Sequence, residues 1–304
     1  MQERLFNLRF NPFELTHKNQ VEPILIEESP LLAGYTFASL MSWRKIFSYE
    51  WALLNDETLI ISGIIPNQNV QYLLQPVGSF TNELQELMLT EMAKLDYQIT
   101  IYGVDDRFIA HYPAFASHFE IKNDLGFANY IYKAEDLALL QGGNYAKKRN
   151  LISQAEKSYP WVANPIKDSC LDECIKLLEK IAFDDQIEND QSLINERIAL
   201  DYTIHHFKEL NQKGIVIKVN DKPVAFSIYE ELNPKTAEIH FEKADRKYKG
   251  LYQLINRETS KEIFESGYEF INREEDMNLP GLRKAKQSYY PVELRPAFQL
   301  VFKK

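Results

Sequence analysis

The sequence is poor in cysteine and has no long hydrophobic run or low-complexity segment. Its two cysteines, Cys170 and Cys174, lie one helical turn apart in an amphipathic segment, which indicates buried thiols and not a disulfide or a metal site. No stretch of about 18 apolar residues occurs, and residues 1–20 contain no apolar core flanked by basic residues. We therefore expect neither a secretion signal nor a transmembrane segment, and we expect a reducing, cytoplasmic location.

Basic residues are outnumbered by acidic ones. The 304 residues include 35 Lys and Arg against 44 Asp and Glu, which gives a formal net charge of −9 at pH 7. This charge disfavours a broad surface for nucleic acid or for an anionic membrane, so any contact with phosphate is expected to be focal. The hydrophobic content of 45% is typical of a globular protein, and the length favours two domains.

The clearest pattern lies in the second half of the chain. Four elements are predicted there in order: a strand at 237–243, a basic loop at 245–250, a helix at 251–265 and a strand at 268–272. Because a helix connects the two strands, we expect them to be parallel neighbours, with a ligand site beyond their carboxyl ends. Three polar residues alternate along the first strand and are expected to share one side of it: Glu238, His240 and Glu242.

The two halves of the sequence follow the same order of elements. The first half predicts a hairpin at 50–64, a strand at 71–75, a helix at 82–95 and a strand at 99–104. The second half predicts helices at 168–183 and 193–210 and a hairpin at 215–230 before the unit described above. We expect a mainly structural N-terminal domain at 1–135 and a C-terminal domain at 136–304 that holds the active pocket.

Five short segments carry a resemblance to a known family. They are Tyr35-Thr36-Phe37-Ala38-Ser39-Leu40 with Trp43-Arg44, Lys147-Lys148-Arg149-Asn150, His240-Phe241-Glu242-Lys243-Ala244, Asn272-Arg273-Glu274-Glu275-Asp276, and Gly281-Leu282-Arg283-Lys284-Ala285-Lys286 with Ser288-Tyr289 and Pro291. Over nearly the whole chain they resemble the family DUF2156, which is related to the C-terminal domain of phosphatidylglycerol lysyltransferases. The resemblance implies an α/β fold of two GNAT-like acyltransferase domains, with mixed sheets flanked by helices, arranged in tandem as in Fem-type aminoacyl transferases.

Acyl transfer needs a base, donors for an oxyanion and a binding place for the phosphates of the acyl donor. Glu242 lies nearest the end of its strand and is the preferred base, with His240 second. The predicted substrate-binding residues are Asn272, Arg273, Glu275, Asp276, Arg283, Lys284, Lys286 and Tyr289. The predicted phosphate-binding or donor-binding residues are Arg246, Lys247, Lys249 and Gly250 in the turn, and Lys147, Lys148 and Arg149 on a helix. No metal site is predicted.

These residues have specific expected roles. Glu275 and Asp276 would bind an amine of an aminoacyl group, and Arg273 would hold a phosphate or carboxylate through two hydrogen bonds. Arg283 is the alternative to Arg273, and Tyr289 could stack on a base. Each residue also has a plainer interpretation as part of a polar sheet face, a solvated loop or a surface ion pair.

Three functions remain open. The favoured one is transfer of an aminoacyl group to an amine or hydroxyl of a small molecule, lipid or peptide. The resemblance implies aminoacyl-tRNA as the donor, and the basic clusters are compatible with a tRNA acceptor end. The second is acyl-CoA-dependent N-acetylation, although Tyr252 stands where the acetyltransferase turn has Gly or Ala. The third is a ligand-binding module without catalysis.

Overall fold

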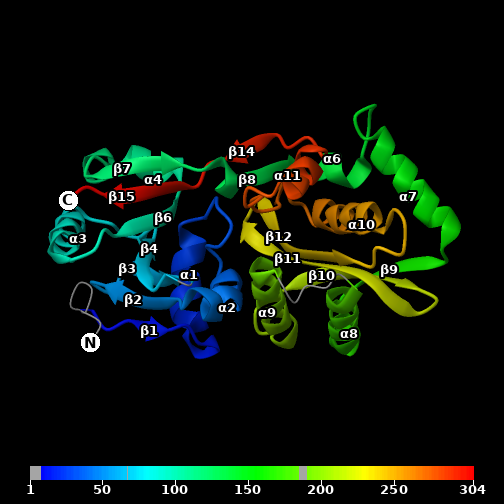
Figure 1. Ribbon diagram of the computed structural model, residues 1–304, viewed down its shortest axis with the longest axis horizontal. Helices are drawn as coiled ribbons and strands as arrows, with labels where there is room; N and C mark the ends of the chain where they lie inside the picture. Colours follow the sequence, from blue (N-terminus) through cyan, green and yellow to red (C-terminus); the bar gives the residue numbers. More distant parts are fainter. Residues whose placement is uncertain (1–7, 67, 185–189) are drawn as a thin grey trace. The chain divides into compact units, whose positions relative to one another are not determined.

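The computed structural model describes residues 8–66, 68–184 and 190–304, and the chain divides into two compact units (Figure 1). The first unit contains Met1–Asn129, Glu275–Asn278 and Arg295–Lys304, and the second contains Tyr130–Glu274 and Leu279–Leu294. The expected division into domains at 1–135 and 136–304 stays a prediction. The expected absence of a secretion signal concerns residues 1–20, of which residues 1–7 lie outside the described part.

The first unit is built around a mixed sheet with the order β1-β2-β3-β4-β6-β15-β7, and β5 pairs with β3. Its strands are β1 (Asn11–Pro12), β2 (Glu50–Leu54), β3 (Thr58–Ile65), β4 (Val70–Leu74), β5 (Val77–Gly78), β6 (Thr100–Val104), β7 (Phe119–Asn123) and β15 (Phe298–Phe302). Its helices are η2 (Leu15–His17), α1 (Lys18–Glu27), α2 (Phe37–Phe47), α3 (Asn82–Lys94), α4 (Asp106–His111), α5 (Pro113–Ala116) and η3 (Leu125–Phe127). The predicted hairpin forms because Asn55 and Asp56 accept the positive φ that a tight turn needs.

The second unit contains a mixed sheet with the order β14-β8-β13-β12-β11-β10-β9. Its strands are β8 (Asn129–Lys133), β9 (Trp161–Pro165), β10 (Lys213–Val219), β11 (Lys222–Asn233), β12 (Thr236–Ala244), β13 (Phe270–Asn272) and β14 (Glu293–Arg295). Its helices are α6 (Ala134–Leu139), α7 (Ala146–Ser158), α8 (Asp168–Asp184), α9 (Gln191–His205), α10 (Leu251–Glu265) and α11 (Pro280–Gln287). The predicted strand, helix and strand are β12, α10 and β13, and β12 and β13 are parallel as expected.

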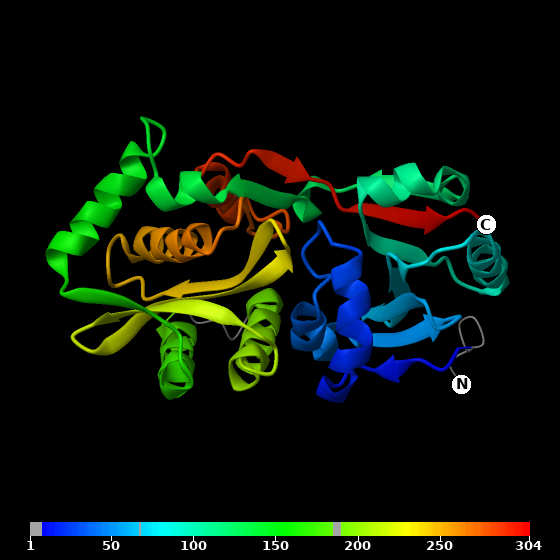
Figure 2. The same ribbon diagram turned by 180° about the vertical axis from the view of Figure 1, so that it is seen from behind.

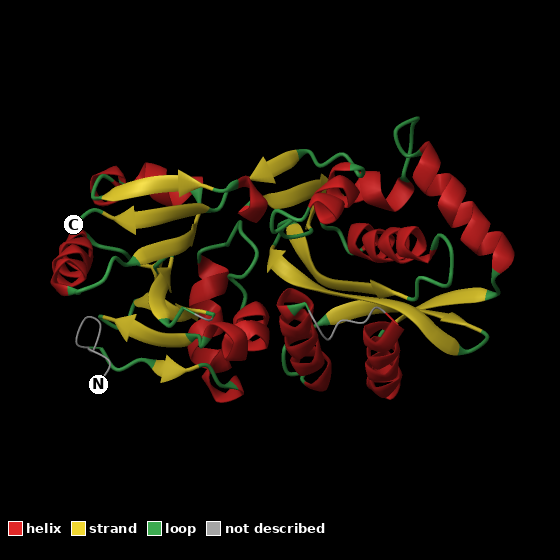
Figure 3. Cartoon of the chain, in the orientation of Figure 1, coloured by secondary structure: helices red, strands yellow, loops and turns green. Residues whose placement is uncertain are grey.

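Helices cover both faces of the second sheet. Figures 1 and 2 show α10 on one face and α8 and α9 on the other, and Figure 3 shows the same layers coloured by secondary structure. The core under α10 joins Leu254 and Ile263 of that helix to Tyr229 and Ile239 of the sheet. Full burial of such apolar side chains contributes about 1.5–3 kcal/mol each, so the predicted apolar stripe of α10 fixes the helix on the sheet. Among the described residues, no helix combines the length and apolar composition that crossing a membrane requires.

Candidate active site

The orientation of the Glu242 side chain depends on an irregularity in β12. Phe241 pairs with Ile228 of β11, whereas Ile239 pairs with the next residue, Tyr229, so His240 is an extra residue in the ladder. A bulge of this kind shifts the alternation of side chains by one position. As a result Glu242 faces α10, where its Oε2 accepts a hydrogen bond from Asn256 Nδ2 at 3.1 Å. The expectation that Glu238, His240 and Glu242 share one side of a regular strand is therefore wrong.

The contacts of the neighbouring residues confirm this shift. Lys243 Nζ lies 2.6 Å from Glu196 Oε2 on α9, which covers the opposite face of the sheet. Glu238 pairs in register with Glu230 of β11. His240 Nε2 lies 2.6 Å from Glu230 Oε1, so the His240 ring lies beside the carboxylates of Glu230 and Glu238 and away from Glu242.

Arg273 follows β13 directly and reaches across to β12. The pairing of β12 with β13 ends at Glu238 and Asn272, although β12 continues to Ala244. Arg273 Nη2 lies 3.3 Å from Glu242 Oε1, and the two side chains are only 15% and 12% exposed. The guanidinium also lies over the ring of Tyr289, with 5.3 Å to its centroid. The structure thus forms a largely shielded ion pair where the two parallel strands separate, at the place predicted for a ligand.

Lys148 reaches the same place from α7. Its Nζ donates a hydrogen bond to Ser288 Oγ at 2.6 Å and lies 3.8 Å from the ring centroid of Tyr289. Burial and the nearby charge of Arg273 lower the pKa of Lys148 to about 8, against the opposing effect of Glu242. Lysine, arginine, glutamate and tyrosine from four separate segments therefore meet in one cluster, which we name the Glu242 cluster: Glu242, Arg273, Lys148 and Tyr289.

His240 is surrounded by carboxylates. Its Nδ1 lies 3.1 Å from Glu274 Oε1 and 3.4 Å from Glu238 Oε1, in addition to the contact with Glu230. Burial by itself lowers the pKa of His240, but the charge of Glu238 and the hydrogen bonds with Glu230 and Glu274 outweigh it and hold the pKa well above its usual value. An imidazolium with both N–H groups engaged has no lone pair to accept a proton. Glu242 is therefore better suited than His240 to act as a base.

Several backbone donors of the basic turn before α10 are occupied. Lys247 N donates to Asp245 Oδ1 at 2.9 Å, and Lys249 N donates to the hydroxyl of Tyr159 at 3.2 Å. Gly250 adopts a φ of +84°, and an added Cβ would lie 2.1 Å from the carbonyl oxygen of Leu151 on α7. The turn is thus closed by contacts within the chain at the position where a phosphate cradle was predicted.

The other predicted binding residues do not join the Glu242 cluster directly. Arg149 Nη1 donates to the carbonyls of Leu140 and Gly142, and Arg246 hydrogen-bonds the hydroxyl of Tyr252. The side chains of Lys147 and Lys284 are exposed and that of Arg283 is half-buried.

Lys286 contacts the backbone of a residue of the cluster. It is buried and its Nζ donates to the carbonyl oxygen of Arg273. Lys286 therefore holds the backbone of Arg273, and its predicted role in substrate binding stays a prediction.

The acidic run after β13 is divided between the two units. Asn272 and Glu274 belong to the second unit, where Asn272 Oδ1 accepts the backbone N–H of Glu274 at 2.8 Å. Glu275 and Asp276 belong to the first unit, and the buried Asp276 accepts the backbone N–H of Asn278 at 2.9 Å. The amine-binding role predicted for Glu275 and Asp276 stays a prediction.

Three residues that shape the cluster were not among the predicted site residues: Asn256, Ser288 and Tyr132. Asn256 is fully buried on α10, where an amide facing a sheet signals a specific hydrogen bond. The hydroxyl of Tyr132 donates to the carbonyl of Lys286 at 2.9 Å and its ring lies 5.9 Å from the guanidinium carbon of Arg273. Only the buried polar position on an apolar helix face could have been noticed in the sequence.

Comparisons with known proteins place this arrangement in context. A model of the family described as phosphatidylglycerol lysyltransferase, C-terminal, matches residues 30–301. A search of the curated proteins found no match. Among solved structures, a conserved protein of unknown function from Bacteroides thetaiotaomicron is 30% identical, with a TM-score of 0.88, over 97% of this chain and 100% of that chain.

More distant structures share the fold. The C-terminal domain (DUF2156) of a proposed lysylphosphatidylglycerol synthetase from Agrobacterium fabrum is 14% identical, with a TM-score of 0.66, over 96% of this chain and 93% of that chain. A tandem GNAT protein from the clavulanic acid biosynthesis pathway is 11% identical, with a TM-score of 0.54, over 98% of this chain and 99% of that chain. FemX is also similar, with a TM-score of 0.59. The predicted fold of tandem GNAT-like domains is confirmed.

Proposed function

The chain belongs to the family of the phosphatidylglycerol lysyltransferase C-terminal domain, and on that premise we propose that it transfers an aminoacyl group from aminoacyl-tRNA to a hydroxyl or amine acceptor. The observation that supports this proposal most is the Glu242 cluster. It combines a carboxylate, two cationic side chains and an aromatic ring where β12 and β13 separate.

The cluster contains the groups that the reaction needs. The acceptor hydroxyl or amine attacks the carbonyl carbon of the aminoacyl ester, and Glu242 takes the proton of the attacking group. The positive charges of Arg273 and Lys148 stabilise the oxyanion that forms on the carbonyl oxygen. The ester bond then breaks, and Lys148, with its pKa of about 8, gives a proton to the ribose oxygen that leaves.

The closed turn favours an aminoacyl ester over an acyl-CoA donor. GNAT acetyltransferases hold the pyrophosphate of coenzyme A with free backbone N–H groups at this turn. Here the N–H groups of Lys247, Lys249 and Leu251 donate to atoms of the chain itself. A donor that needs no pyrophosphate cradle fits this arrangement better. We therefore place acyl-CoA-dependent acetylation second.

We propose a lipid hydroxyl as the first acceptor to test, because the family takes its name from transfer to phosphatidylglycerol. The purified chain is incubated with tRNA charged with radiolabelled amino acids, one at a time, and with vesicles that contain phosphatidylglycerol. Transfer is measured as radioactivity that enters the organic phase. Parallel reactions replace the lipid with soluble amines, and others replace the charged tRNA with labelled acetyl-CoA.

The decisive variant is Glu242→Gln. Its control is Glu265→Gln, which changes an exposed residue at the end of α10. Loss of a general base lowers the rate by about 10²–10⁴-fold, so we expect that loss for Glu242→Gln and an unchanged rate for the control. Transfer from acetyl-CoA alone would support the second function. Equal rates for Glu242→Gln and the wild type would refute the role of Glu242.

A further inference from the structure

The first unit contains a cavity of about 420 Å³ whose lining includes none of the predicted site residues. It lies beyond the carboxyl ends of the parallel strands β4 and β6, because Gln75 follows β4 directly and Asp105 follows β6. In the second unit, Glu242 and Arg273 occupy the corresponding place beside β12 and β13. The first unit therefore has a cavity at the place where sheets of this kind bind ligands.

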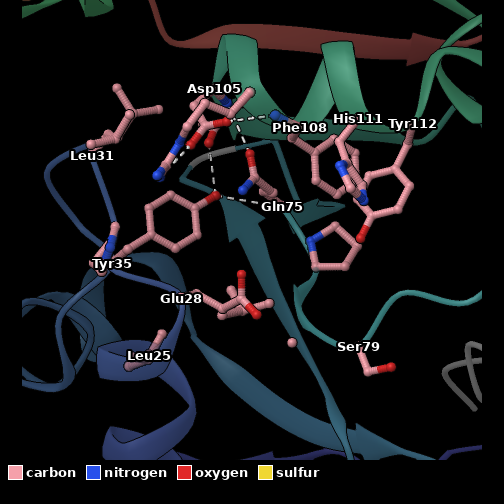
Figure 4. A pocket seen from close by; sticks show the side chains of 17 residues that line it. Leu25, Glu28, Leu31, Tyr35, Gln75, Ser79, Asp105, Phe108, His111 and Tyr112 are labelled. Atoms are coloured by element: carbon pink, nitrogen blue, oxygen red, sulfur yellow. Dashed lines mark hydrogen bonds and ion pairs between the residues drawn. The ribbon is translucent and has the colours of Figure 1, made fainter.

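One wall of the cavity is formed by a network of hydrogen bonds (Figure 4). The hydroxyl of Tyr35 accepts the backbone N–H of Gln75 at 2.8 Å and donates to the carbonyl of Gly103 at 2.8 Å. Gln75 Oε1 accepts the backbone N–H of Asp105 at 2.9 Å. These bonds fix the orientation of the Gln75 amide, and within the described residues its Nε2 donates to no other group. A preformed donor thus lines the cavity.

The rim carries charges of both signs. Arg107 Nη2 bonds the Asp105 carboxylate and the carbonyl of Ser29, both at 3.2 Å, and its side chain is 50% exposed. Asp105 is therefore neutralised. Glu28 stands near Tyr112, whose pKa is raised by burial and by the charge of Glu28. In the described part of the chain the Glu28 carboxylate forms no hydrogen bond or ion pair, so a ligand cation could take that place.

Apolar side chains complete the walls. They come from the end of α1, the following loop and the segment after β4: Leu25, Leu31, Leu32, Pro76 and Val77. Figure 4 shows Glu28 between Tyr35 on one side and Tyr112 on the other, with Gln75 above it. A carboxylate, an amide donor with an arginine, and an apolar wall match the three parts of an amino acid: ammonium, carboxylate and side chain.

We propose that the first unit binds a free α-amino acid with an apolar side chain. Glu28 pairs with the ammonium group, the Gln75 amide and Arg107 hold the carboxylate, and the side chain packs against the apolar wall. The proposal does not rest on the transferase activity, because every residue involved lies in the first unit.

Isothermal titration of the full chain with leucine and phenylalanine tests the proposal. For each amino acid, the matching amine without the carboxylate and the matching acid without the ammonium group are titrated as well. We expect binding of the amino acid and at least a tenfold loss of affinity for each partial analogue. Failure of both amino acids to bind at millimolar concentration, or equal affinity for a partial analogue, would overturn the proposal.

The variant Glu28→Gln tests the ammonium contact, and Glu27→Gln is its matched control on the same helix end. Both side chains are exposed, so both variants should fold, which thermal melting verifies. We expect at least a tenfold loss of affinity for Glu28→Gln and wild-type affinity for Glu27→Gln. Glu242→Gln should also bind as the wild type does, which separates this site from the proposed active site. Unchanged affinity in Glu28→Gln contradicts the assignment.

Discussion

Replacing Lys148 with methionine should stabilise the fold while it removes transfer. Lys148 is half-buried beside Arg273, and burial with that charge lowers its pKa from 10.5 to about 8. A charged lysine in such a place costs folding free energy at neutral pH, because the unfolded chain carries the same proton without the penalty. A methionine keeps the length of the side chain and removes the charge. In the proposed reaction this charge stabilises the oxyanion, which is the role that would offset the cost.

The size of the effect follows from the shift in pKa. Taken without screening, the shift corresponds to an upper limit of about 3 kcal/mol at pH 7. The Lys148 side chain is only half-buried, so solvent screens its charge and we reduce the expected gain to about 1 kcal/mol. Little is lost elsewhere, because Ser288 Oγ still donates to the carbonyl of Ala285 at 2.6 Å.

Urea unfolding of Lys148→Met at several pH values measures this gain. The pKa of Lys148 is lowered in the folded state, so the penalty is complete below about pH 8 and disappears as pH rises toward 10.5. The gain of the variant should therefore be largest at pH 7, small near pH 10 and absent above about pH 11. Lys147→Met, an exposed neighbour, should show no gain. A destabilised Lys148→Met variant, or a gain that does not change with pH, would refute the reasoning.

Two further predictions concern stability. Gly250→Ala should lower the free energy of unfolding by about 3 kcal/mol, because φ is +84° and the new Cβ would lie 2.1 Å from the carbonyl oxygen of Leu151. Gly142→Ala, at φ +81° with no described atom within 4 Å, should lower it by only about 1 kcal/mol. Urea unfolding compares the two variants, and equal costs would contradict the closed turn. His240→Gln should destabilise most below about pH 6.5 and progressively less as pH rises through the elevated folded-state pKa, since the stabilisation belongs to the imidazolium; a loss that is constant from pH 6 to 9 would show that the ring is not charged.

Local sequence patterns predicted most of the second unit. The alternation at residues 237–243 and the stripe of Leu251, Leu254 and Ile255 became β12 and α10, because both elements bury one apolar face on a shared core. Asn220 and Asp221 mark the turn between β10 and β11, where both residues have positive φ. Such alternations, stripes and turn residues span only a few positions, so they can be recognised without the tertiary structure.

Contacts between distant segments could not be predicted in the same way. Strand β15, at the end of the chain, lies between β6 and β7 of the first sheet, although no local pattern links Phe298–Phe302 to those strands. Lys148 and Ser288 are 140 positions apart, yet they share a hydrogen bond. The predicted basic residues of α7 also differ in role, since Lys148 is half-buried in the cluster, Arg149 bonds backbone carbonyls and Lys147 is exposed. Only the packing of α7 decides which of the three reaches the cluster.

The position of Glu242 shows where a periodic pattern fails because of a bulge in the strand. A regular strand would place Glu242 on the face opposite Ile239, toward α9, and away from Arg273. The extra residue at His240 reverses this, so that Glu242 shares the α10 face with Ile239 and receives a hydrogen bond from Asn256. The same bulge leaves the His240 ring among Glu230, Glu238 and Glu274, where the charge of Glu238 and the hydrogen bonds with Glu230 and Glu274 raise the pKa of His240. These contacts thus secure the irregular residue in place, and the irregularity directs the carboxylate of Glu242 to the point where the strands separate.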